Sequence, residues 1–257
     1  MWIDTHTHLT DEDYADPAAI VADFDADGID FVITVGYDLA SSEAAVKLAE
    51  AHDRVFAAVG VHPHDAAGFD DRAAARLSEL CRSQKTVAFG EIGLDYHYDK
   101  SQSALQKEVF AAQLELADRA GLPVIFHARE ATGDFNEVLE ANAGKLRAGG
   151  VLHCYANGAE LVGKYAAMGL YFGFGGSTTF KNARGLLDAV RAAPADRILT
   201  ETDCPYLAPV PHRGETNFPK YVALAAQKCA ELRETEIQTF CAQVRENTLR
   251  LFRRIPG

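Results

Sequence analysis

The chain lacks the features of a membrane-spanning or secreted protein. No run of 18 or more apolar residues occurs in its 257 residues, so no segment is expected to span a membrane. The opening stretch, MWIDTHTHLTDED, has neither the basic nor the apolar region of a secretory signal. The five cysteines are odd in number and scattered, which favours free thiols in a reducing compartment over a disulfide framework. We therefore expect a cytoplasmic protein without a membrane partner.

Positive charge is also scarce. Lysine and arginine total 25 against 37 aspartates and glutamates, which gives a formal net charge of −12 at pH 7. This balance argues against a general electrostatic attraction to nucleic acid or to anionic membranes. It does not exclude a substrate that contains phosphate, because bound metal ions would be the largest local charges in a site.

Apolar, strand-like runs alternate with helix-like stretches along the whole chain. The runs lie at 1–6, 30–36, 55–61, 86–92, 123–127, 150–154, 170–174 and 197–202. The clearest helix-like stretches are 41–52, 70–83, 103–121, 181–193 and 219–253. This alternation predicts an α/β protein with a parallel sheet, and eight is the number of strands that closes a barrel. We expect a single (β/α)8 TIM-barrel domain over residues 1–257.

Potential metal ligands stand at or just past the ends of these runs. They are His6, His8, Glu91, His127, His153 and Asp203. In a closed barrel such ends converge on the face that carries active sites. In a doubly wound open sheet, the rival architecture, they would spread over tens of ångströms at roughly 4.8 Å per strand. The convergence of four imidazoles and two carboxylates therefore favours the barrel and predicts a metal site.

The spacing of the ligands suggests two metal ions. His6 and His8 are two residues apart, so on a strand both side chains lie on the same face. Imidazole with carboxylate suits Zn, Mn, Ni or Fe, and Mg is also compatible with the carboxylates. Six protein ligands exceed what one open tetrahedral site uses, and they fit two sites that share a carboxylate. Glu91 is the natural bridge, while Asp203 can bind one metal and accept a proton from the attacking water.

Four neighbouring residues have predicted supporting roles. We expect Asp4 to orient one imidazole through its second ring nitrogen. Cys154 and Cys204 directly follow predicted ligands and should point outward, because successive strand residues face opposite sides. Glu201 shares a strand face with Asp203, so it either supports the ligands or is a buried structural acid.

Nine short blocks, in order along nearly the whole chain, resemble one known family. They are DTHTHL (4–9), GVHPH (60–64), GEIGLDYH (90–97), PVIFHARE (123–130), HCY (153–155), TFKNA (179–183), ETDCPYLAP (201–209), HRG (212–214) and RENTLRLF (245–252). The chain resembles the TatD family of metal-dependent deoxyribonucleases, within the amidohydrolase superfamily. The resemblance implies a (β/α)8-type barrel. It also implies 3′–5′ exonucleolytic hydrolysis of DNA phosphodiester bonds by a water that two metal ions activate.

The resemblance also assigns residues. It implies two ligand sets that share one carboxylate: His6, His8, Glu91 and Asp203 in one, and Glu91, His127 and His153 in the other. His62 and His64 match positions that face the substrate, the alternative being that they are loop histidines beside Pro63. Arg129 and Arg213 could hold phosphate oxygens in a bidentate manner, with surface ion pairing as the alternative.

Three stretches depart from the usual family pattern: Ala128, residues 155–158 and residues 214–219. None contains a predicted ligand, and all lie in loops expected to shape substrate binding. The expected cofactors are two divalent ions among Mg, Mn, Zn and Ni. The expected partner is DNA, through its single-stranded ends, and the expected state is a monomer or a weak homo-oligomer. Two alternatives remain, namely a hydrolase of an amide, lactone or aminoacyl ester, and a metal-binding barrel without turnover.

Overall fold

The computed structural model describes residues 1–98 and 100–257. Within these residues eight strands form one sheet: β1 (Trp2–Thr7), β2 (Ile29–Val35), β3 (Val55–Val59), β4 (Thr86–Asp95), β5 (Val124–Arg129), β6 (Gly150–Leu152), β7 (Leu170–Phe174) and β8 (Ile198–Thr200). The strands follow the order of the chain, and each paired neighbour is parallel. The predicted (β/α)8 barrel is confirmed, with strand ends that differ from the predicted ones by a few residues.

The barrel closes where the end of β8 meets β1. Thr7 forms a parallel bridge with Cys204. The Asp203 amide donates to the His6 carbonyl at 2.9 Å, and the His8 amide donates to the Cys204 carbonyl at 2.7 Å. Because these bonds fasten the loop after β8 onto β1, the last predicted ligand in the sequence lies beside the first two.

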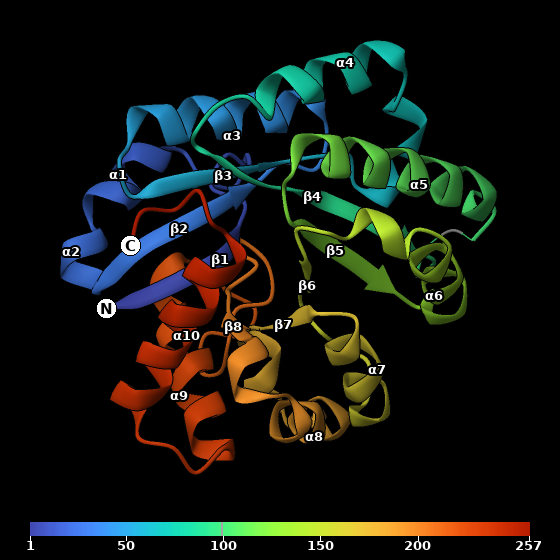
Figure 1. Ribbon diagram of the computed structural model, residues 1–257. Helices are drawn as coiled ribbons and strands as arrows, with labels where there is room; N and C mark the ends of the chain where they lie inside the picture. Colours follow the sequence, from blue (N-terminus) through green and yellow to red (C-terminus); the bar gives the residue numbers. More distant parts are fainter. Residues whose placement is uncertain (99) are drawn as a thin grey trace.

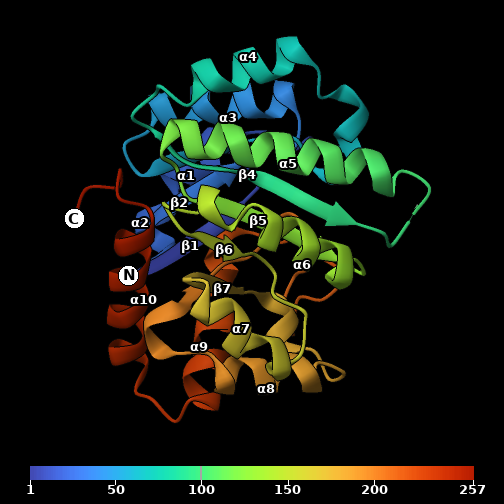
Figure 2. The same cartoon turned by 45° about the vertical axis from the view of Figure 1, so that its right-hand side comes forward.

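Helices cover the outside of the sheet (Figure 1). The α-helices of the described residues are α1 (Pro17–Ala22), α2 (Phe24–Asp27), α3 (Leu39–Ala51), α4 (Asp71–Leu80), α5 (Ser103–Ala120), α6 (Thr132–Ala141), α7 (Val162–Ala167), α8 (Arg184–Ala192), α9 (Val222–Leu232) and α10 (Ile237–Leu251). The short 3-10 segments are η1 (Pro63–Gly68), η2 (Ala143–Lys145), η3 (Ala159–Leu161), η4 (Gly176–Thr179), η5 (Ala195–Arg197) and η6 (Pro219–Tyr221). In both views α3, α4 and α5 lie together, and α9 and α10 pack near β1 (Figure 2). None of the described helices is long and apolar enough to cross a membrane.

The start of α3 shows how side chains set the element bounds. The predicted helix began at Ser41, but the observed one begins at Leu39 after an N-cap at Asp38. The Asp38 carboxylate accepts a hydrogen bond from the Ser41 amide at 2.7 Å, and Ser41 bonds back to the cap. This reciprocal pairing satisfies amide donors that a helix start leaves without partners.

Apolar side chains fill the barrel from its amino end. Ile33 and Val151 point into the interior, where they pack with Leu251 and Phe252 from the end of α10. Fully burying a side chain of this size contributes about 1.5–3 kcal/mol. The interior therefore has an apolar floor, and the polar residues occupy the opposite, carboxyl-terminal mouth.

Two register shifts occur at strand segments that carry predicted ligands. The pairing of β1 with β2 shifts between residues 4 and 7, and that of β4 with β5 shifts between residues 89 and 92. An extra residue at a β-bulge re-aims the side chains that follow it. His6 and Glu91 lie within these two segments, so the irregular pairing sets the direction of both side chains.

Candidate metal centre

The end of β1, the middle of β4 and the loop after β8 bring four donor groups together. The Nε2 atoms of His6 and His8 are 3.2 Å apart. Oδ1 of Asp203 lies 3.5 Å from the first and 3.4 Å from the second. Oε2 of Glu91 lies 3.4 Å from Nε2 of His6. Two imidazoles and two carboxylates thus face a common point, a donor set that suits a divalent cation.

The ends of β5 and β6 add a second group around the other oxygen of Glu91. Its Oε1 is 2.6 Å from Nδ1 of His127 and 2.7 Å from Nε2 of His153. These two nitrogens are 3.2 Å apart. The two oxygens of Glu91 therefore face different pairs of histidines. The structure brings together all six residues that the sequence singled out.

The electrostatics of the cluster fit a cation. Burial raises the pKa of Glu91, but the charge and hydrogen bonds of the neighbouring His153 and His127 outweigh it and hold that pKa well below its usual range. The pKa of Asp203 is also lowered, since the hydrogen bond from His8 and the charge of nearby histidines overcome its burial. Both carboxylates are therefore ionised, which is the form that binds a metal.

The imidazoles divide into two kinds. Burial, together with the charge on His153, lowers the pKa of His6 to about 4, so this ring is neutral and a nitrogen lone pair is free to bind a metal. Its Nδ1 is buried and has no hydrogen-bond partner among the described residues. The pKa of His153 is raised to about 10, because the charge and hydrogen bond of Glu91 exceed the cost of burial. The Glu91 carboxylate thus stabilises a positive charge beside it, which either a proton on His153 or a bound cation can supply.

Asp95 is a site residue that the sequence analysis missed. Its Oδ2 is 2.9 Å from Nε2 of His127 and 3.2 Å from Nε2 of His64, and its Oδ1 accepts from the His97 amide at 2.8 Å. A carboxylate on the second nitrogen of a ligand histidine fixes the orientation of the ring. The signal was present in the sequence, because Asp95 stands four residues after Glu91 and a strand that continued to it would place both on one face.

Two buried glutamines of α5 position the loops that lead to these groups. Gln106 accepts from the Asp95 amide and donates to its carbonyl, each at 3.0 Å. Gln113 makes the same pair with Val61, at 2.8 Å and 2.9 Å. The side-chain amides act as partners for backbone that the sheet does not pair. One helix therefore fixes the end of β4 and the segment that leads to His62.

The loop after β8 is held in an unusual conformation. Asp203 has a φ of +60°, in the left-handed region that residues other than glycine seldom adopt. Nδ2 of Asn217 donates to the carbonyls of Thr202 and Tyr206, at 3.0 Å and 2.6 Å. The Tyr14 hydroxyl in turn donates to the Asn217 carbonyl at 2.5 Å. Part of the atypical stretch 214–219 thus anchors the loop that presents Asp203.

Two expectations about neighbouring residues are wrong. Asp4 orients no imidazole: its carboxylate accepts from the amides of His6 and Thr202 and from the Thr202 hydroxyl. Asp4 therefore provides hydrogen-bond acceptors for backbone amides where β1 and the segment after β8 meet. Cys154 does not point outward, because its φ of +44° breaks the strand alternation and it lines the central cavity. Cys204 is fully buried.

Glu201 supports the backbone at the end of β6. Its Oε1 accepts from the Cys154 amide and lies 3.7 Å from Nδ1 of His153. Burial raises its pKa to about 7, against the lowering effect of the His153 charge. A Cβ added at Gly173 would lie 2.2 Å from Oε2 of Glu201, so a larger residue there would displace this buried carboxylate. The absence of a side chain at Gly173, within β7, thus leaves room for Glu201.

The predicted substrate-contacting residues occupy different environments. Nε2 of His62 is 3.9 Å from Oε1 of Glu91, and burial lowers the pKa of this histidine to about 3. His64 and Arg129 line the central cavity. Arg213 is exposed instead, with its guanidinium 4.3 Å from the centre of the Phe180 ring, and it is not among the cavity-lining residues.

A cavity of about 660 Å³ opens above the cluster. Its wall includes His8, Glu91, His127, His153 and Asp203. This volume lies within the range of sites for small molecules, roughly 300–1,000 Å³. Five of the six predicted ligands thus face a pocket large enough for part of a substrate, while His6 is fully buried behind them.

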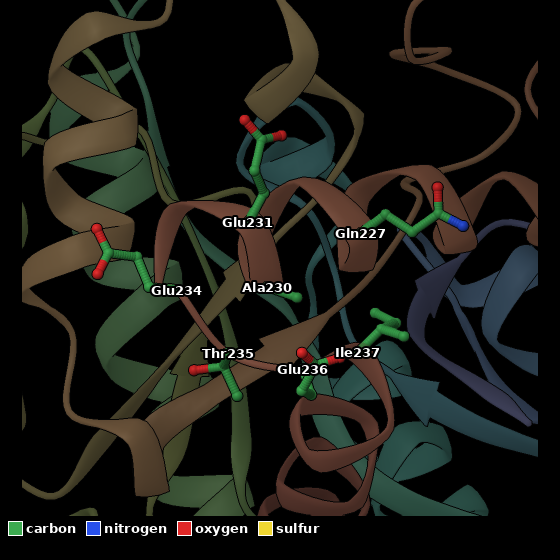
Figure 3. A pocket seen from close by; sticks show the side chains of 7 residues that line it. All are labelled: Gln227, Ala230, Glu231, Glu234, Thr235, Glu236 and Ile237. Atoms are coloured by element: carbon green, nitrogen blue, oxygen red, sulfur yellow. The ribbon is translucent and has the colours of Figure 1, made fainter.

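A second hollow lies at the turn between α9 and α10 (Figure 3). Glu231, Glu234 and Glu236 line it together with Gln227, Ala230, Thr235 and Ile237. It contains none of the predicted ligands and no histidine. Its carboxylates have no imidazole beside them, unlike those of the central cavity, so we place the candidate site at the barrel mouth.

Comparison with known proteins gives a consistent picture. The family model described as TatD related DNase matches residues 3–253. The metal-dependent hydrolase YabD of Bacillus subtilis (strain 168) is 41% identical over 254 residues, which cover 98% of this chain and 99% of that protein. The 3′-5′ ssDNA/RNA exonuclease TatD of Enterobacter lignolyticus (strain SCF1) is 34% identical over 256 residues, which cover 97% and 98%.

A solved structure agrees with the sequence relatives. The crystal structure of YJJV, a TatD homolog from Escherichia coli K12, superimposes with a TM-score of 0.92 at 28% sequence identity. The match covers 98% of each chain. The similarity therefore extends over the whole barrel and includes the strand ends that carry the six clustered residues.

Proposed function

Because the chain belongs to the TatD-related DNase family, we propose that it removes nucleotides from the 3′ end of single-stranded DNA by divalent-metal-dependent hydrolysis. Membership makes it a metal-dependent hydrolase. The name of the Enterobacter relative supports nucleic acid as the substrate. The observation that carries the proposal is Glu91, whose two oxygens face two separate groups of donors.

The cluster has the composition of a two-cation site. We assign one cation to His6, His8, Glu91 and Asp203, and the other to Glu91, His127 and His153. The ionised carboxylates and the neutral His6 fit this role. When bound, two divalent cations supply Lewis acidity, which polarises a phosphoryl oxygen and lowers the pKa of an attacking water.

The chain's own residues would move the proton and hold the substrate. Asp203 is ionised and lies at the edge of the cavity, so its carboxylate can accept a proton from the attacking water. Arg129 lines the same cavity and can donate two parallel hydrogen bonds to a phosphate. His62 is neutral and can donate one hydrogen bond to a phosphate oxygen without adding charge.

The direct test is a DNA degradation assay. Protein stripped with a chelator and reloaded with Mg or Mn is incubated with a short single-stranded oligonucleotide that carries a 5′ label. The expected products form a ladder that shortens with time, because nucleotides leave from the 3′ end. A 3′-labelled copy should release labelled mononucleotide at once. Intact DNA after reloading with each candidate metal would refute the proposal.

One feature favours a second candidate, the hydrolysis of a carbonyl ester, amide or lactone. Acidic residues exceed basic ones in the chain, and Asp65 joins Asp95 in the cavity wall. An acidic surround disfavours a polyanionic substrate, whereas Lewis acidity serves carbonyl hydrolysis equally well. The same reloaded protein should therefore be assayed against a panel of esters, amides and lactones. Turnover there with intact DNA would favour this candidate.

A further inference from the structure

Among the described residues, three of the five large apolar side chains that are exposed to solvent line the cavity mouth. Over residues 1–98 and 100–257 this class comprises Met1, Tyr98, Tyr206, Leu207 and Val210. Tyr98 is 74% exposed and Tyr206 is 48% exposed, and both line the cavity together with Leu207. Exposed apolar groups that cluster around a pocket mark a binding surface. Stability does not explain them, because exposed rings contribute little to the core.

The two tyrosines stand on different sides of the metal centre. Tyr98 follows β4, and Tyr206 follows β8, which adjoins β1 at the barrel closure. In a closed barrel of eight strands in sequential order, β4 and β8 are opposite each other. A substrate centred on Glu91 would therefore have one ring on each side.

Each ring contacts side chains of the cavity wall or of its rim. The Tyr206 hydroxyl donates to Oδ2 of Asp11 at 2.7 Å, and its ring centre is 5.9 Å from that of His8. The Tyr98 ring is 5.5 Å from His64, and the Arg129 guanidinium is 5.4 Å from its centre. Rings that are already oriented lose little entropy when a planar ligand stacks on them.

We propose that Tyr98 and Tyr206 stack on the unpaired nucleobases that flank the bond to be cleaved; this rests on the proposed function. An aromatic ring beside an arginine that can hold phosphate is the combination by which proteins bind single-stranded nucleic acid. Bases in a duplex already stack on their neighbours and are not free to stack on the tyrosines. The two rings therefore select single-stranded ends and tolerate any base sequence.

The test separates base recognition from phosphodiester cleavage. Tyr98→Ala and Tyr206→Ala are compared with the unchanged enzyme on two single-stranded substrates. One is ordinary DNA, and the other has tetrahydrofuran residues, which lack bases, at its two 3′-terminal positions. On ordinary DNA each alanine variant should raise KM by roughly 5- to 150-fold with little change in kcat, since a stacked base contributes that much to binding. On the base-free substrate the same variants should leave KM unchanged.

Conservative variants and a remote control complete the design. Tyr98→Phe and Tyr206→Phe keep the rings and should restore the low KM. Val210→Ala removes an exposed apolar side chain that does not line the cavity, so its KM should equal that of the unchanged enzyme. A KM that rises equally on both substrates, or on neither, would overturn the stacking proposal even if DNA is degraded.

A binding measurement remains informative if no substrate is cleaved. In excess chelator, an oligonucleotide with 2-aminopurine as its 3′-terminal base is titrated with protein. Stacking on an aromatic ring should quench the fluorescence of 2-aminopurine, and the quenching should be lost in the two alanine variants. An absence of quenching with the unchanged protein would refute stacking. Failure of cleavage with intact quenching would instead refute the proposed function alone.

Discussion

Replacing Asp203 by asparagine should slow turnover by several orders of magnitude, roughly 10²- to 10⁴-fold, while leaving the fold and most of the metal binding intact. The substitution removes the negative charge and the basic oxygen but keeps an amide oxygen near Nε2 of His6 and His8, which lie 3.5 Å and 3.4 Å from Oδ1. Asparagine also tolerates the left-handed conformation that position 203 requires, at a φ of +60°. The change therefore tests chemistry with little disturbance of the backbone.

The size of the effect follows from the role assigned to the carboxylate. A positioned general base contributes roughly 10²- to 10⁴-fold to a rate. At about 1.36 kcal/mol per factor of ten, this corresponds to roughly 2.7–5.5 kcal/mol of the activation barrier. His6, His8 and Glu91 remain as ligands, so the metal content should fall by much less than the rate.

The assay measures kcat on single-stranded DNA alongside the metal content of the same preparation. Glu234→Gln makes the same acid-to-amide change at the exposed turn between α9 and α10, and its kcat should equal that of the unchanged protein. Full activity in Asp203→Asn would refute the assigned role. Loss of both activity and all metal would show that Asp203 acts as a ligand and not as the base.

The remaining predictions concern metal affinity and stability. Asp95→Asn should weaken metal binding roughly 10- to 100-fold in a competition titration, because His127 loses the partner that fixes its ring; unchanged affinity would contradict this role. Gly93→Ala should lower the free energy of unfolding in urea by more than about 3 kcal/mol, since its Cβ would lie 1.9 Å from the His127 carbonyl oxygen at a φ of +150°. Gly133→Ala is the control, because this position in α6 has open space around it, and it should change the free energy of unfolding by less than about 1 kcal/mol. Equal changes in the two variants would refute the steric argument. When free metal is present at about 100 times its Kd, removing it should lower the free energy of unfolding by about 2.7 kcal/mol. The melting temperature, Tm, should then fall by roughly 5–10 °C in a scanning fluorimetry experiment. An unchanged Tm would contradict cation binding to the folded state.

The barrel and the cluster could be predicted from the sequence because both depend on simple periodicity. Each of the six clustered residues ends or follows an apolar run, and parallel strands in a closed barrel bring those ends together. The proximity of His6 and Asp203 could therefore be predicted despite the length of chain between them. Their hydrogen-bonded proximity in the structure confirms that reasoning.

The missed details depend on local backbone geometry that periodicity does not contain. The predicted strand ended at residue 92, but β4 continues to Asp95, so a carboxylate in contact with His127 was overlooked. Simple alternation also misplaced Cys154, because a left-handed residue interrupts the strand pattern there. Asp4 was assigned to an imidazole because a sequence does not show which backbone amides a bulge leaves without partners.

Counting the cations tests the central claim that Glu91 joins two metal sites. The protein is reloaded with Mn or Zn, freed of unbound metal by gel filtration, and analysed by elemental mass spectrometry. The unchanged protein should hold two divalent cations per chain. Glu91→Gln should hold fewer, because the loss of the shared carboxylate weakens both sites. A single cation per chain in both proteins, or two in both, would contradict the account.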